Sequence, residues 1–359
     1  MNATPSPYRF EAFEVSYFSA KIRPALRYKQ LWYEETRADI RDILQRTGMA
    51  YIPVLLTPEG ETWQDSSEMY DRLEARHPQP PLFPTSPVQL LAAHLVELYN
   101  DEFGTIPAMH YRWGSELGES SARSRFIAMI GSEEFGNKAA DQMAAARFAV
   151  GASEEAAPAI EAHTRDLLDA LSVHFQSQPY LFGARMTFGD CALMGLLDGH
   201  FFTDLVSRRL LLETARPVVG WIERCKFPNT DQQGEWLSDD ELAPTFREAL
   251  GVMGRDAAPV ILDSVKGFEA WADERPEGST EPPRSTGWVE TSLRGTPIKR
   301  MIQSYTLWML QRTLDTYAEL DEAACKRVDE AVAGTGWEPV LAYEPRHRLE
   351  KDGYKLVFV

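Results

Sequence analysis

Short apolar runs alternate with amphipathic stretches over the first 75 residues of the chain. Apolar runs with aromatic content favour strands, and apolar positions three and four residues apart favour helices. The strand-like runs cover residues 8–15, 31–36, 51–56 and 62–63, and the helical stretches cover 20–30, 37–45 and 64–74. The order strand, helix, strand, helix, hairpin, helix predicts a small α/β domain.

The junction between the first strand and the first helix, Ser16 to Arg27, is the stretch where we expect chemistry. A helix N-terminus exposes backbone N–H groups and the positive end of its dipole. A hydroxyl at this position can therefore hold or stabilise an anion. Pro53 interrupts a later strand-like run, because proline cannot donate a ladder hydrogen bond, and its peptide bond is a candidate for the cis form.

A proline-rich linker at residues 77–84 separates this domain from a region with helical spacing that extends from Pro87 to about Ala215. Within that region, Thr187 and Asp190 have the spacing of a capping box and precede a buried apolar helix. These patterns predict an all-helical bundle as the second domain.

The last third of the chain mixes helical and strand-like patterns. We expect helices at residues 241–251, 258–272, 297–320 and 322–333, a strand at 288–293, and a hairpin around Asp352-Gly353. Residues 274–284 have the composition of a linker. The pattern predicts a mixed α+β extension after the helical bundle.

Charge and composition narrow the possible functions. The formal net charge of -17 argues against nucleic-acid or anionic-membrane partners, which need a basic surface. No apolar run approaches the roughly 20 residues of a membrane span, and the first residues lack a signal-peptide pattern, so we expect a cytoplasmic protein. The 3 cysteines lie far apart and the 7 histidines show no metalloprotease spacing, so the sequence predicts neither a disulfide framework nor a metal site.

Three motifs resemble those of cytosolic glutathione S-transferases over residues 8 to about 200. The first is the junction from Ser16 to Leu26, the second joins Ile52-Pro53-Val54-Leu55 to Asp65–Leu73, and the third is Thr187–Leu193. The resemblance implies a thioredoxin-like, glutathione-binding domain at residues 1–83 and a helical domain at residues 87–214. It implies nothing about the extension, residues 215–359.

By this resemblance, glutathione would lie across one edge of the N-terminal domain. The backbone of Ile52, beside a cis Pro53, would pair with the cysteinyl part of glutathione, and Asp65 and Ser66 would hold its γ-glutamyl end. Ser66 offers a hydroxyl and a backbone N–H to a carboxylate, while Asp65 can accept from the ammonium. Asp65 stands where the family usually has glutamate or glutamine, and Gln64 could share its task. The alternative is that Asp65 and Ser66 only cap a helix.

Three hydroxyls are candidates for activating the glutathione thiol, in the order Ser16, Tyr17, Ser19. Any of them could donate to the sulfur and lower the pKa of the thiol. The alternative is that Tyr17 packs in the core and the two serines only cap the helix. Lys21 and Arg23 could add positive potential toward glutathione, or could form a solvated basic face. No cysteine occupies this stretch, which excludes disulfide exchange through a thiol of the protein there.

The resemblance implies a glutathione-dependent transferase, or a relative that cleaves ethers, dehalogenates or isomerises, acting on a small apolar electrophile. The electrophile would lie between the domains, near Glu102 and residues 110–113. The alternative is a non-catalytic binding or interaction protein that uses the extension, where Trp288, Trp308 and Trp337 could form a partner surface or a lid. The family also implies a homodimer.

Overall fold

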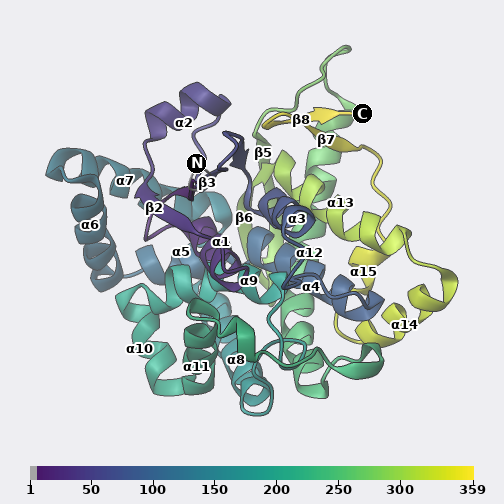
Figure 1. The fold of residues 1–359 in the computed structure, drawn as a ribbon. Helices are drawn as coiled ribbons and strands as arrows, with labels where there is room; N and C mark the ends of the chain where they lie inside the picture. Colours follow the sequence, from purple (N-terminus) through teal and green to yellow (C-terminus); the bar gives the residue numbers. More distant parts are fainter. Residues whose placement is uncertain (1–5) are drawn as a thin grey trace.

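The computed structural model describes residues 6–359, and its first part is a small α/β domain (Figure 1). Its 4-stranded sheet has the order β2-β1-β3-β4. The strands are β1 (Tyr8–Ala12), β2 (Tyr33–Arg37), β3 (Val54–Leu56) and β4 (Thr62–Gln64), and the helices are α1 (Tyr17–Tyr28), α2 (Ile40–Thr47) and α3 (Ser66–Arg76). Strand β1 is parallel to β2 and antiparallel to β3. The element order matches the prediction and confirms the thioredoxin-like domain.

The register of the sheet brings three connections to one end. Val54 lies opposite Glu11 on β1 and opposite Gln64 on β4. The loop that leaves β1 toward α1, the segment that enters β3, and the loop that leaves β4 toward α3 therefore emerge side by side. The Ile52–Pro53 peptide bond in the second of these segments is cis.

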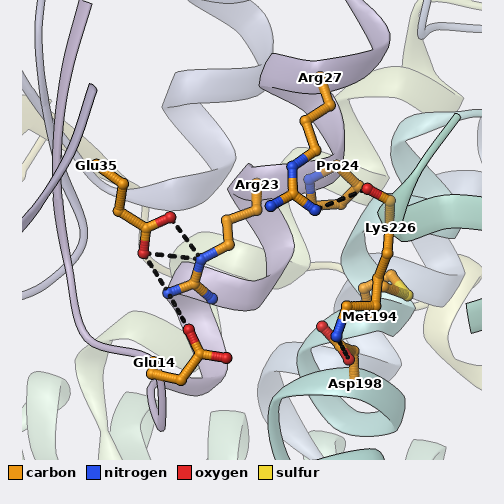
Figure 2. Close-up of a pocket in the computed structure, with 8 residues that line it drawn as sticks. All are labelled: Glu14, Arg23, Pro24, Arg27, Glu35, Met194, Asp198 and Lys226. Carbon is orange, nitrogen blue, oxygen red and sulfur yellow. Dashed lines mark hydrogen bonds and ion pairs between the residues drawn. The ribbon is translucent and has the colours of Figure 1, made fainter. Parts of the chain in front are cut away.

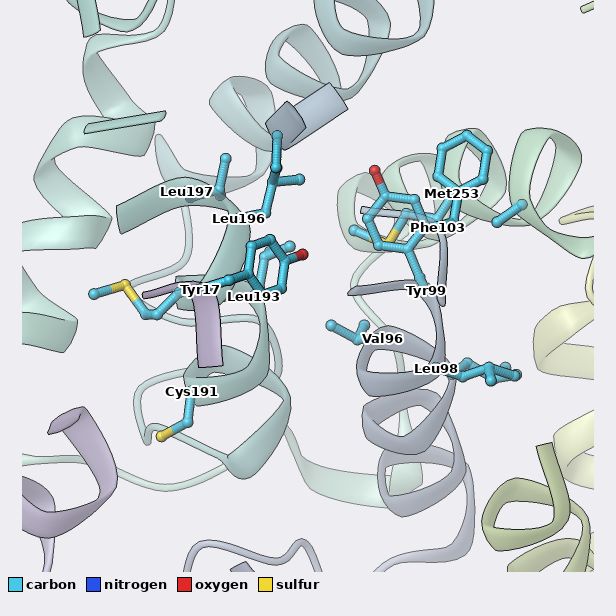
Figure 3. Close-up of a cluster of buried hydrophobic side chains, with 14 of the residues drawn as sticks. Tyr17, Val96, Leu98, Tyr99, Phe103, Cys191, Leu193, Leu196, Leu197 and Met253 are labelled. Atoms are coloured by element: carbon cyan, nitrogen blue, oxygen red, sulfur yellow. The ribbon is translucent and has the colours of Figure 1, made fainter. Parts of the chain in front are cut away.

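Helices form the second part of the chain. They are α4 (Pro87–Glu102), α5 (Thr105–Trp113), α6 (Glu116–Ile130), α7 (Glu133–Val150), α8 (Ala157–Phe175), α9 (Phe188–Leu196), α10 (Leu205–Thr214) and α11 (Arg216–Lys226), with a π-helical turn at Leu197–Phe202 after α9. Thr187 and Asp190 form both bonds of a capping box at the start of α9, as the sequence predicts. Apolar side chains of α4 and α9 meet those of α1 in a shared core (Figure 3).

Short 3-10 turns at Thr230–Gln232 and Ser238–Asp240 follow α11, and residues 244–359 are called the C-terminal segment below. Its elements are α12 (Pro244–Asp273), β5 (Ser285–Leu293), β6 (Thr296–Gln303), α13 (Ser304–Ala318), α14 (Glu322–Val332), α15 (Glu338–Leu341), β7 (Leu349–Asp352) and β8 (Lys355–Phe358). Helices α12, α13 and α14 all pack on α4. Helix α13 of the C-terminal segment thus lies near α3 and α4 (Figure 1), while its strand β6 packs against α7.

Two predictions for the C-terminal segment are wrong. Residues 297–303 are not the start of a helix but strand β6, because Arg294 and Gly295 adopt positive φ values of 53° and 81° and turn the chain back onto β5. Alternate residues of β6 are then buried, the period of a strand. Helix α12 is continuous over 30 residues through Pro259, where two helices were expected. Apolar burial on both sides of that proline outweighs its usual cost of about 3 kcal/mol.

The hairpin at the C-terminus and helix α14 are confirmed, with Gly353 at a φ of 60° in the turn between β7 and β8.

Among residues 6–359, no helix is long and apolar enough to cross a membrane. Over the same residues, no group of three or more His, Cys, Asp and Glu side chains is arranged to hold a metal ion.

Candidate functional site

Ser16 lies at the N-terminus of α1, at the end of the sheet where the three connections meet. This end of the sheet is called the corner below. Its backbone is extended (φ -84°, ψ 126°), and its Oγ accepts a hydrogen bond from the backbone N–H of Ser19 at 3.2 Å. The side chain is half-buried. Because the bond from Ser19 uses Oγ as an acceptor, the hydroxyl proton of Ser16 can still be donated to a ligand.

Tyr17 follows directly but faces the interior. Its hydroxyl lies 2.7 Å from the carbonyl oxygen and 2.8 Å from Oδ1 of Asn100 on α4, and only 7% of the residue is exposed. The ring lies between α9 and α4 (Figure 3). Burial raises the pKa of Tyr17 well above its ordinary value. This geometry counts against Tyr17 as the hydroxyl that activates a bound thiol.

Ser19 and Lys21 are both fully buried, so neither reaches the half-open corner at Ser16. The Oγ of Ser19 has no hydrogen-bond partner within the described residues. The Lys21 ammonium lies 2.6 Å from Asp101 and 3.3 Å from Glu97, both on α4. Burial alone would lower the pKa of Lys21, but the two carboxylates outweigh burial and raise it. Lys21 therefore links α1 to α4, and this geometry counts against its predicted role in holding glutathione.

Arg23 is directed to the other side of β1. Its Nε lies 2.9 Å and 3.0 Å from the carboxylate oxygens of Glu35 on β2 (Figure 2). Strand β2 flanks β1 on the side away from β3, so Arg23 faces away from the segment around Pro53. It lines a hollow of about 120 Å³ in which acidic and basic side chains pair with one another. This placement counts against the expected contact of Arg23 with glutathione.

The segment before β3 presents backbone groups at the corner. Ile52 is half-buried, and within residues 6–359 its N–H and carbonyl have no hydrogen-bond partner. The Gln64 amide donates to the carbonyls of Met49 and Tyr51, at 3.0 Å and 2.8 Å, and so holds this segment against β4. Gln64 therefore supports the loop, and these bonds count against the expected contact of its amide with the γ-glutamyl end of glutathione.

Asp65 and Ser66 begin α3 beside this segment. Asp65 caps the helix, because its Oδ1 accepts from the backbone N–H groups of Ser67 and Glu68 at 2.9 Å and 3.3 Å. Its φ is 90°, a backbone conformation that side-chain-bearing residues rarely adopt and that costs of order 1–3 kcal/mol. Ser66 is 5% exposed, and its hydroxyl forms no side-chain hydrogen bond within residues 6–359. The capping alternative is thus present at Asp65, and beside it lies a largely buried hydroxyl.

Two residues of the C-terminal segment meet Asp65. Its second oxygen, Oδ2, accepts from the Tyr305 hydroxyl at 2.6 Å and from the Lys351 ammonium at 2.8 Å. Burial would raise the pKa of Asp65, but Lys351 and Tyr305 outweigh it and hold that pKa below its ordinary value. Asp65 is therefore a carboxylate whose counter-charge is already supplied by the chain.

Sequence reasoning missed both partners of Asp65. They lie 240 and 286 residues further along the chain, and neither has a motif that points to the N-terminal domain. The one usable signal was the Asp352-Gly353 turn, which places Lys351 in a hairpin but does not say what the hairpin contacts.

The residues expected to form the wall for a second substrate are largely internal. Arg112 is 3% exposed and bonds Asp204 at 2.7 Å, and Glu102 accepts from the Thr306 hydroxyl at 2.5 Å. His110 is half-buried and lies 3.4 Å from Glu161. Of the three tryptophans expected in a lid or partner surface, Trp337 is fully buried and Trp288 is 49% exposed.

The family model for the glutathione S-transferase N-terminal domain matches residues 11–81, and the model for the C-terminal domain matches residues 127–226. No curated protein matches the chain. Similar solved structures include a glutathione S-transferase from Rhodospirillum rubrum, which is 18% identical over 67% of this chain and 97% of that chain, with a TM-score of 0.42. A glutathione S-transferase from Methylobacterium radiotolerans, in complex with glutathione sulfonate, is 23% identical over 65% and 99% of the two chains, with a TM-score of 0.39.

The β-etherase LigF from Sphingobium sp. strain SYK-6 is 14% identical over 63% of this chain and 97% of that chain, with a TM-score of 0.41. Residues 227–359 lie beyond both matched domains. The two domain matches confirm the family that the sequence motifs indicate: residues 11–81 and 127–226 belong to the glutathione S-transferase superfamily.

Proposed function

We propose that this protein is an enzyme that binds glutathione at the corner formed by Ser16, Ile52 and Ser66, and activates its thiol for attack on a small apolar electrophile. Transfer, ether cleavage, dehalogenation and isomerisation all begin with the same thiolate. In this proposal Ile52 pairs with the cysteinyl backbone, and the α3 N-terminus at Ser66 receives the γ-glutamyl carboxylate.

The observation that carries the proposal is a set of three polar groups with unused hydrogen-bonding capacity at one end of the sheet. They are the hydroxyl proton of Ser16, the backbone of Ile52 and the largely buried hydroxyl of Ser66. An extended peptide with a central thiol has a donor, a peptide unit and a carboxylate to place against such groups. The helix dipole of α1 adds to the effect of the Ser16 hydroxyl, because both favour a thiolate over a thiol.

The domain boundaries, a homodimer and a cytoplasmic location belong to the same proposal. Helix α11 lies inside the matched C-terminal domain, so we place the start of the extension after residue 226 rather than at 215. Sedimentation of the full chain would test the dimer.

Ser16→Ala is the variant that tests the proposal. We expect turnover with a general electrophile to fall about 100-fold, the usual effect of losing one hydrogen bond to a developing anion, with little change in glutathione affinity. Ser115→Ala is the matched control, since the Ser115 hydroxyl caps α6 rather than α1 and accepts the same 3.2 Å bond from the backbone N–H three positions on.

Calorimetry with glutathione and a turnover assay supply the two readouts. No heat of binding at millimolar glutathione would contradict the proposed ligand. Equal turnover in Ser16→Ala, Ser115→Ala and the unmodified protein would contradict the role of Ser16 while leaving glutathione binding in place.

A further inference from the structure

Lys351 places a positive charge at Asp65, where the ammonium of glutathione would otherwise be received. The ammonium of Lys351 lies 2.8 Å from Oδ2 of Asp65 and 3.9 Å from Glu68. The Asp65 side chain is 8% exposed and that of Lys351 is 14% exposed, so the pair is largely shielded from water. Neither oxygen of Asp65 is free for an incoming ammonium, because Oδ1 caps α3 and Oδ2 bonds Lys351 and Tyr305.

The C-terminal segment holds Lys351 firmly in this position. Leu349, two residues earlier on β7, exchanges two 3.0 Å hydrogen bonds with the side chain of Gln311 on α13. The Lys351 ammonium also lies over the ring of Trp308, 4.6 Å from its centroid. On the far side of the turn, the Tyr354 hydroxyl donates to the carbonyl of Thr62 on β4 at 3.1 Å. The hairpin is thereby fixed to both α13 and the sheet.

Helix α13 contributes the second donor and its own attachment to the N-terminal domain. Tyr305, at its start, donates to Asp65 at 2.6 Å. Two turns later, Arg312 makes a two-pronged ion pair with Asp71 on α3. Tyr305 and Lys351 therefore approach Asp65 from two elements that are each anchored elsewhere, so their presence at the corner does not depend on the Asp65 contact alone.

From this arrangement we propose that Lys351 is a specificity-determining residue, which makes the subsite at Asp65 and Ser66 select a carboxylate without a neighbouring ammonium. The inference rests on the proposed function and deepens it. An ammonium ion has three donors, so Lys351 can bond Asp65 and still donate to a ligand carboxylate seated on the α3 N-terminus. A ligand ammonium would have to displace Lys351 from Asp65, whereas a ligand that lacks it would not.

The test compares two thiols by calorimetry. One is glutathione, and the other is glutaryl-cysteinylglycine, which is glutathione without its amino group. We expect the unmodified protein to bind the deaminated thiol at least as tightly as glutathione. The preference is the ratio of the affinities for the two thiols. In Lys351→Met this ratio should shift toward glutathione by about tenfold, the effect of one charge-assisted hydrogen bond, because Asp65 becomes available to the ammonium.

Lys355→Met is the matched control. Lys355 lies in the same hairpin and pairs with Glu281 at 2.9 Å, so the variant removes the same charge without touching Asp65. Its preference should equal that of the unmodified protein. Lys351→Gln, which keeps a donor without the charge, replaces Lys351→Met if thermal unfolding shows that the latter is not folded.

A shift in preference of less than about threefold in Lys351→Met, or the same shift in Lys355→Met, overturns the inference and leaves the proposed function intact. Failure of both thiols to bind any variant overturns both.

Discussion

The two helix N-termini at the corner of the N-terminal domain differ in what meets them. Ser16 caps α1 through a single bond from Ser19, and its half-buried hydroxyl keeps a proton to donate. Asp65 caps α3 in the same way, but two side chains of the C-terminal segment also bond its outer oxygen. The family domain thus supplies the thiol end of the candidate site by itself, while the other end is completed by residues outside the matched domains.

Replacing the two capping residues with alanine should show this difference most clearly. Asp65→Ala removes the cap, the ion pair with Lys351 and a residue type that tolerates the φ of 90°. We expect it to lower the free energy of unfolding by about 3 kcal/mol, against about 1 kcal/mol for Ser16→Ala, which loses only a cap. Chemical denaturation of both variants measures the two losses.

Asp65→Asn separates the contributions at this end. Asparagine keeps a capping oxygen and tolerates positive φ, but its amide group replaces Oδ2. It therefore loses the charge that Lys351 pairs with and the acceptor of the Tyr305 hydroxyl. Its destabilisation should lie between those of the two alanine variants. Equal losses for Asp65→Ala and Ser16→Ala would mean that the C-terminal segment adds no stability at Asp65, and the contrast between the two ends would fail.

The thiol end was accessible to sequence reasoning because its determinants are local. Alternating apolar runs gave the order of strands and helices, and the serine before α1 had the residue type of a cap. The three candidate hydroxyls could not be ranked in this way. Whether Tyr17 faces the corner or Asn100 depends on how α4 packs against α1, which no spacing within one helix records.

The end of the candidate site at Asp65 could not be predicted from the sequence, because the residues that complete it lie far along the chain. No local pattern pairs Lys351 with Asp65 across 286 residues. The strand β6 was mistaken for a helix for a related reason: in a run such as Pro297 to Gln303, two isoleucines four residues apart fit a helix face and a strand face equally well. Only its pairing with β5 decides between them.

Tyr17→Phe tests whether the hydroxyl nearest to Ser16 serves the core rather than the ligand. The variant loses the bonds to Asn100, and we expect a destabilisation of about 1–2 kcal/mol with glutathione affinity unchanged and turnover within twofold. Tyr70→Phe is the control, since its buried hydroxyl donates to the Lys21 carbonyl at 2.9 Å. A tenfold loss of turnover in Tyr17→Phe alone would return Tyr17 to the site and remove Ser16 as the sole donor.

The smallest expected effect concerns Ser19, the third candidate hydroxyl. Its Oγ is fully buried without a partner within residues 6–359, so Ser19→Ala removes an unsatisfied polar group and should leave stability unchanged or raise it by less than about 1 kcal/mol. Ser264→Ala is matched to it, because Ser264 is equally buried in a helix but donates to the Val260 carbonyl at 2.8 Å. In chemical denaturation, the free energy of unfolding of Ser264→Ala should be about 1 kcal/mol lower than that of Ser19→Ala, the net value of one hydrogen bond. Thermal unfolding should give the same order. A loss of turnover in Ser19→Ala at unchanged stability would show instead that this hydroxyl reaches the thiol.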